Sequence, residues 1–163
     1  MNIVTDEALK KKYNKLYKKF IKGDFLEVIK ECNKILKKRK HQLFFNLLSF
    51  AYQKSGKIEK SIDIMREALA LNPNHPNFLN NIGTCFYMLH KYSEAEKYFK
   101  KGLEIDNKHL HILNNLGNLK RETSKIEDSI EYYKKVLGIQ NDAVPALFNL
   151  VGIYMICRLV LIM

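Results

Sequence analysis

A short string of residues recurs through this chain at a fixed interval of 34 positions. Residues 113–118 read Leu-Asn-Asn-Leu-Gly-Asn, and residues 79–84 read Leu-Asn-Asn-Ile-Gly-Thr. Weaker copies occupy residues 45–50 and 147–152. A repeat of this length indicates a stacked array, in which a single unit cannot bury its apolar face alone. The period therefore constrains the fold more strongly than any single motif.

Each unit predicts two helices joined by a tight turn. Turn signals lie at 55–57, 89–91 and 123–125, and apolar residues between them recur at the spacing of an amphipathic helix. Residues 6–22 predict a first helix, and Gly23 separates it from a second one. No segment alternates apolar and polar residues as a half-buried strand does. We therefore expect an all-α fold of stacked antiparallel helix pairs.

Small and large residues occupy fixed slots in these pairs. Gly83 and Ala95 are small residues on the two helices of one pair, and Gly117 and Ser129 take the same slots in the next. We expect them to let the two helices approach closely, while large residues such as Phe99 fill the space between pairs.

The slots follow the pattern of a known family. The unit from Pro76 is the clearest, with Leu79, Ile82, Gly83, Phe86, Ala95, Phe99 and Gly102 in register. The units from Gln42 and Leu110 repeat this pattern, although Lys120 stands where an aromatic residue is usual. The chain thus resembles the tetratricopeptide repeat family. That resemblance implies a right-handed α-solenoid over 1–163, with a degenerate repeat at 6–41, clear repeats at 42–75, 76–109 and 110–143, and an incomplete repeat at 144–163.

The resemblance also implies that the first helix of each pair lines a concave groove. An Asn amide offers an acceptor and two donors, so it can pair with the backbone of an extended peptide whatever its side chains. The alternative is that some of these Asn residues cap helices or bond within the stack. The predicted groove residues are Asn46, Asn80, Asn81, Thr84, Tyr87, Asn114, Asn115, Asn118, Arg121 and Asn149.

The string at 114–118 is similar to the repeats that precede the catalytic part of O-linked N-acetylglucosamine transferases. A second use of the family, the clamp that binds the carboxylate of a chaperone tail, needs Lys and Arg in groove slots. His111 and Asn115 stand where the third repeat of such a clamp would carry basic residues, so the clamp is disfavoured.

No catalytic residue, metal site or cofactor is predicted. His109 and His111 have no thiol or carboxylate at metal-ligand spacing, and there is no phosphate-binding glycine loop or nucleophile constellation. We therefore expect that the chain as it stands is not an enzyme.

The net charge of +11 is concentrated near the start of the chain. Residues 1–41 hold 13 Lys or Arg and 5 Asp or Glu, a net of +8, and residues 42–163 hold 15 and 12, a net of +3. A basic region raises nucleic acid as a partner. However, 24 of the 28 basic residues are Lys, whereas bidentate phosphate and base recognition usually uses Arg. The composition therefore disfavours nucleic acid and indicates solvated helix faces.

The three cysteines, Cys32, Cys85 and Cys157, are widely spaced and form no CxxC pair. This pattern is typical of reduced thiols in the cytosol. The first residues also lack the basic-then-apolar order of an export signal. We therefore expect a cytoplasmic protein.

The last unit abandons the repeat. Residues 144–154 begin another first helix, but residues 153–163 are apolar apart from Arg158. Arrays normally end in a helix with a polar outer face. Three explanations stay open: a fragment of a longer protein, a homo-oligomer formed through residues 150–163, or contact with a membrane. Asn149 and Arg158 interrupt the apolar stretch, so the membrane is the least favoured.

We therefore expect a scaffold for protein–protein interaction, which binds an extended peptide or a partner protein in the groove. The alternative is a segment that recruits substrates for a longer glycosyltransferase or sulfotransferase. The sequence does not identify the partner.

Overall fold

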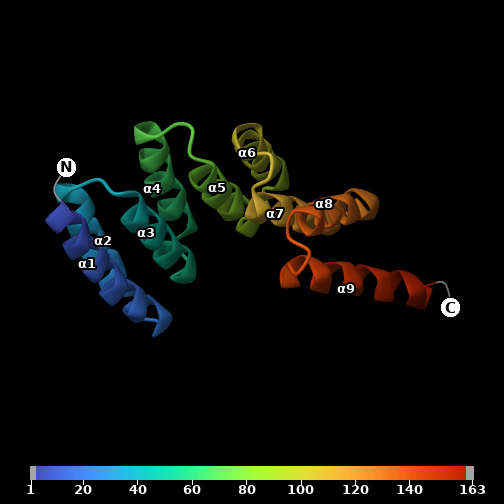
Figure 1. The fold of residues 1–163 in the computed structure, drawn as a ribbon, viewed down its shortest axis with the longest axis horizontal. Helices are drawn as coiled ribbons and strands as arrows, with labels where there is room; N and C mark the ends of the chain where they lie inside the picture. Colours follow the sequence, from blue (N-terminus) through green and yellow to red (C-terminus); the bar gives the residue numbers. More distant parts are fainter. Residues whose placement is uncertain (1–2, 161–163) are drawn as a thin grey trace. The chain divides into compact units, whose positions relative to one another are not determined.

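The structure, a computed structural model, describes the backbone of residues 3–160 and the side chains of residues 7–156. Within that part the chain forms nine helices and no strand, so the predicted all-α fold is confirmed (Figure 1). The chain divides between Pro73 and Asn74 into two compact units. The first unit contains α1 (Ile3–Ile21), α2 (Phe25–Lys38), α3 (Gln42–Lys54) and α4 (Ile58–Leu71). The second contains α5 (Pro76–Met88), α6 (Tyr92–Ile105), α7 (Leu110–Glu122), α8 (Ile126–Ile139) and α9 (Val144–Val160).

The helices pack as consecutive antiparallel pairs within each unit. In the second unit α5 packs on α6 and α7 packs on α8, while α6 contacts α7 and α8 contacts α9. The two first helices, α5 and α7, also touch each other. This arrangement places equivalent residues of α5 and α7 side by side.

Each pair is closed by a turn in which one residue adopts a left-handed backbone conformation. These residues are Gly23, Gly56, His90 and Ser124, with φ angles of 88°, 75°, 57° and 59°. The residue that follows each of them donates its N–H to the carbonyl five positions back, as Lys91 does to Phe86 at 2.9 Å. This is the Schellman end of a helix. The predicted turns at 55–57, 89–91 and 123–125 are therefore built alike.

A glycine makes room for an aromatic ring where the helices of a pair cross. A Cβ added to Gly83 of α5 would lie 2.5 Å from the ring of Phe99 on α6. Gly117 of α7 has the same relation to Tyr133 of α8, again at 2.5 Å. Both rings are fully buried. The glycines therefore leave space for the rings of the second helices, a role that the spacing alone did not predict.

Serine hydroxyls bond across the same crossing in two of the pairs. Ser129 of α8 donates to the carbonyl of Gly117 at 2.8 Å, and Ser61 of α4 donates to the carbonyl of Ser49 at 3.1 Å. These buried hydroxyls are thereby satisfied, and they fix how closely the helices approach.

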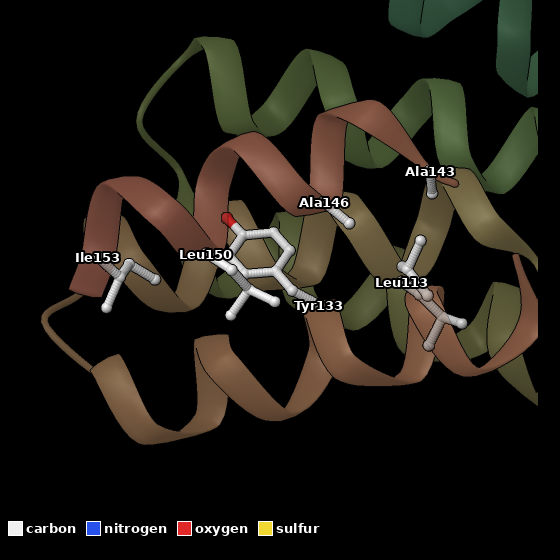
Figure 2. Packing of buried hydrophobic residues seen from close by; sticks show 7 residues of the cluster. Leu113, Tyr133, Ala143, Ala146, Leu150 and Ile153 are labelled. Atoms are coloured by element: carbon white, nitrogen blue, oxygen red, sulfur yellow. The ribbon is translucent and has the colours of Figure 1, made fainter. Parts of the chain in front are cut away.

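One face of α9 completes the core of the second unit. Ala146, Leu150 and Ile153 of α9 pack with Leu113 and Tyr133 (Figure 2). The opposite side of the helix is also apolar but open, and the ring of Phe148 is 78% exposed. We call this side the open α9 face; it consists of Val144, Leu147, Phe148, Val151, Tyr154, Met155 and Ile156.

We expect Gly83→Ala to lower the free energy of unfolding by ~1–2 kcal/mol. Overpacking against Phe99 costs roughly 1–3 kcal/mol, and the better helix propensity of alanine returns at most about 1 kcal/mol. Gly138→Ala is the matched control, because beyond the neighbouring residues and backbone of its own helix no described atom lies within 4 Å of the added carbon. We expect that control to raise stability by up to about 1 kcal/mol. Chemical denaturation measures both, and changes of the same sign would contradict the packing described.

Candidate functional site

A polar contact joins the first helices α5 and α7. The side-chain amide nitrogen of Asn115 donates to Oδ1 of Asn80 at 2.9 Å and to Oγ1 of Thr84 at 3.3 Å. Thr84 in turn donates to the backbone carbonyl of Asn80 at 2.9 Å. These side chains are half-buried. The contact therefore fixes the rotamers of three groups that remain in reach of solvent.

A second polar contact joins α7 and α9 in nearly the same way. Nδ2 of Asn149 donates to Oδ1 of Asn118 at 3.1 Å, and that oxygen also accepts from the hydroxyl of Tyr133 at 2.7 Å. Oδ1 of Asn149 accepts from Arg121 at 3.0 Å. Asn149 and Asn118 stand 34 positions after Asn115 and Thr84, so the repeat carries this contact forward. We call Asn80, Thr84, Asn115, Asn118, Arg121 and Asn149 the amide face.

The amide face keeps hydrogen-bonding groups that no described residue uses. Both lone pairs of the Asn118 carbonyl are occupied, which leaves its amide nitrogen with two free donors. Asn115 uses its nitrogen and keeps its oxygen free, whereas Asn80 uses its oxygen and keeps its nitrogen free. Donors and acceptors thus alternate along α5 and α7 on groups that are already oriented.

Tyr87 lies at the edge of the amide face. It lines a depression of about 20 Å³ together with Thr84, Asn115 and Asn118, which is room for roughly one water molecule. Burial, assisted by the carboxylate of Glu122, raises the pKa of Tyr87. Its phenol therefore stays protonated and can donate a hydrogen bond.

Two of the predicted groove residues of the second unit lie apart from the amide face. Asn81 is only 5% exposed, so its amide lies in the interior and has almost no surface for a ligand. Asn114 is half-buried on α7, but it lines a different pocket, near the start of α9. Of the nine predicted residues in the second unit, the structure thus brings six together, with Tyr87 beside them. The tenth, Asn46, is half-buried on α3 of the first unit.

Tyr133 is a supporting residue that was not among the groove residues predicted from the sequence. Its ring is fully buried, and burial raises the pKa of its hydroxyl, which holds Asn118 in place. The equivalent residue one unit earlier is Phe99, where Thr84 replaces Asn118. A hydroxyl on an otherwise buried ring needs a partner. That paired change was the signal that could have revealed the contact.

Two family models match this chain, both named tetratricopeptide repeat. One matches residues 42–108 and the other matches residues 110–142. The matches span 67 and 33 residues, so together they cover 100 of the 163 residues. The chain belongs to the tetratricopeptide repeat family. A search of curated proteins finds no match.

Solved tetratricopeptide (TPR) structures share the fold at low sequence identity. TTC0263, a thermophilic TPR protein in Thermus thermophilus, is 15% identical with a TM-score of 0.79, covering 88% of this chain and 79% of that one. YrrB, described as a TPR protein with an unusual peptide-binding site, is 22% identical with a TM-score of 0.67, covering 80% and 68%. The first TPR of Spaghetti (RPAP3), bound to the HSP90 peptide SRMEEVD, is 20% identical with a TM-score of 0.65, covering 71% and 92%.

Lys120 occupies a slot that usually holds an aromatic residue in tetratricopeptide repeats. Here its side chain forms an ion pair. The Lys120 side chain is only 8% exposed, and its Nζ lies 3.0 Å from Oε1 of Glu96 on α6. Lys100 also contacts Glu96, at 2.7 Å. Burial alone would raise the pKa of the Glu96 carboxyl, but its hydrogen bonds with Lys100 and Lys120 outweigh burial and lower it. The substitution thus exchanges ring packing for a charge contact between α6 and α7.

Across the part of the chain with described side chains, no group of three His, Cys, Asp or Glu residues is arranged to hold a metal ion. Among the described helices, none has the length and apolar character needed to cross a bilayer.

We expect Glu96→Gln to lower the free energy of unfolding by about 2 kcal/mol near neutral pH, since a hydrogen bond to a charged group contributes roughly 1.5–3 kcal/mol. Folding lowers the pKa of Glu96, so its contribution is complete above the ordinary value of 4.5 and is lost as pH falls through the folded-state pKa. The difference between parent and variant should therefore shrink on acidification.

Denaturation curves recorded from neutral to strongly acidic pH measure this difference. Glu131→Gln on the exposed side of α8 is the control, and it should leave stability nearly unchanged. A loss for Glu96→Gln that stays constant across the whole pH range would rule out the ionic contact as its cause.

Proposed function

We propose that this protein is an interaction module that binds an extended peptide segment of a partner protein on its amide face. The observation that carries the proposal is the set of oriented, unused amide groups on Asn80, Asn115 and Asn118. An extended peptide presents backbone N–H and C=O groups in alternation, which is the pattern that these amides complement. Recognition through the backbone would tolerate many partner sequences.

The hydrogen bonds among the amides support this function through pre-organisation. Asn115 and Asn118 are each held by a neighbouring helix, so little side-chain freedom remains to be lost on binding. Ordering a free polar side chain at an interface costs roughly 0.5–1.5 kcal/mol. The amide face avoids much of that cost. YrrB, which has a peptide-binding site, and the first TPR of RPAP3, which binds an HSP90 peptide, share this fold and support the same role.

We also propose that the protein is located in the cytoplasm, because its described thiols are buried and form no disulfide. Cys32 and Cys85 are buried, and neither forms a disulfide. Burial, with a smaller effect of Glu31, raises the pKa of the Cys32 thiol to about 12. A buried protonated thiol of this kind is inert and suits a reducing compartment.

We expect Asn115→Ala and Asn118→Ala each to weaken peptide binding about 3- to 10-fold, because each removes hydrogen bonds with a net value of roughly 0.5–1.5 kcal/mol. Asn107→Ala, an exposed linker position of the same residue type, is the control. A random octapeptide display library selects ligands for the parent, and fluorescence anisotropy then compares the variants. Selected peptides that bind all three variants like the parent would place the binding site elsewhere.

The open α9 face supports a second contact, and we propose that it pairs with another copy of the chain. An apolar helix face is normally buried, whereas Phe148, Val151 and Met155 of α9 form an exposed stripe. A two-fold dimer would place this stripe against itself.

We expect Phe148→Glu to convert a dimer into a monomer. The Phe148 side chain is 78% exposed in the single chain, and a carboxylate there would be buried without a partner in the dimer interface. Analytical ultracentrifugation of the parent and the variant measures the change. Glu104→Gln on the exposed side of α6 is the control and should leave the mass unaltered. A parent that sediments as a monomer at every concentration would refute the dimer.

A further inference from the structure

A pocket of about 400 Å³ opens where α7 begins, α8 ends and α9 begins. Its walls are mostly apolar, and Leu110, Val136 and Ala146 belong to them. Its polar groups are Asn114, Gln140, Asp142 and His111. None of the described residues that line it is Lys or Arg. The pocket therefore combines an apolar wall with a rim that carries a carboxylate and amide groups.

Asn114 contributes a buried acceptor that nothing satisfies. Its Oδ1 is shielded from solvent and has no hydrogen-bond partner among the described residues. One repeat earlier, Oδ1 of Asn80 accepts from Asn115, so the equivalent donor for Asn114 would be Asn149. Asn149 keeps the contact with Asn118, which corresponds to Thr84, and its oxygen accepts from Arg121, but it makes no bond with Asn114. The Asn114 oxygen is therefore left unsatisfied in the wall of the pocket.

A buried acceptor without a hydrogen bond is unfavourable unless a ligand supplies a donor. Buried polar atoms are almost always hydrogen-bonded, and each exception calls for an explanation. The group that satisfies Asn114 must carry N–H or O–H, and it must reach past an apolar wall. Asp142, which is exposed at the rim, favours a donor that is positively charged.

We propose that this pocket receives a lysine or arginine side chain of the bound peptide. The proposal rests on the function proposed above, and it adds a preference in sequence to recognition of the backbone. The aliphatic stem lies along Leu110 and Val136, as long cationic side chains do on apolar surfaces. The charged end donates to Asn114 and lies near Asp142. An acidic side chain finds no cation here, and the two oxygens oppose it.

The test uses the octapeptide library on the full chain, followed by matched peptides. We expect lysine or arginine to be enriched at one peptide position for the parent. Replacing that arginine by citrulline, its neutral isostere, should lower the affinity for the parent by about tenfold, the lower part of the range for a hydrogen bond to a charged group. For Asn114→Leu and Asp142→Asn the same replacement should change affinity less than about twofold.

The controls separate this inference from the proposed function. Glu131→Gln removes an exposed charge outside the pocket and should keep the parent's preference for arginine over citrulline. Thermal melts of all variants confirm that they are folded. Peptides that depend on Asn115 and Asn118 but show no preference for cationic residues overturn the pocket assignment and leave the function standing. Enrichment of acidic residues overturns it as well. Failure to select any peptide overturns both.

Discussion

The contact between a glycine on a first helix and an aromatic ring on the second is the constraint on which the second unit depends. Gly83 receives Phe99, and Gly117 receives Tyr133, with no space for even one added carbon atom. Because interiors are packed like crystals, this contact sets both the distance and the rotation of the two helices. Every other feature of the unit inherits that geometry, including which side of the first helix remains open.

The same contact links stability to the candidate site. The Tyr133 ring fills the core below Gly117, and its hydroxyl emerges to hold Asn118. A single side chain therefore packs the pair and orients a group that could bind a ligand. In the preceding pair, Phe99 supplies the packing without the hydroxyl, and Thr84 bonds the backbone of its own helix. The two pairs are alike in their cores and differ in their polar surfaces.

The sequence predicted the pairing and the turns because each depends on local spacing that the period repeats. It could not predict which asparagines reach the surface. Asn81 and Asn115 occupy the same slot, yet the first is buried and the second is half-buried. Burial depends on what the adjoining elements place against a residue, and the period carries no information about that. Lys120 shows the same limit, because its partner Glu96 lies on another helix and 24 positions away.

The departures from repetition are therefore more informative about function than the repeats. Position 87 is Tyr, and its counterpart 34 positions later is Arg121, which takes the oxygen of Asn149. Asn115 bonds helix α5 at two residues, whereas Asn149 bonds α7 at Asn118 and Arg121 and leaves Asn114 without a donor. Arg121 thus donates to the oxygen of Asn149, while the nitrogen of Asn149 keeps its contact with Asn118 and makes none with Asn114. Strict repetition would have given the Asn114 oxygen a donor, so the polar surface of the second unit differs from pair to pair where its repeats disagree.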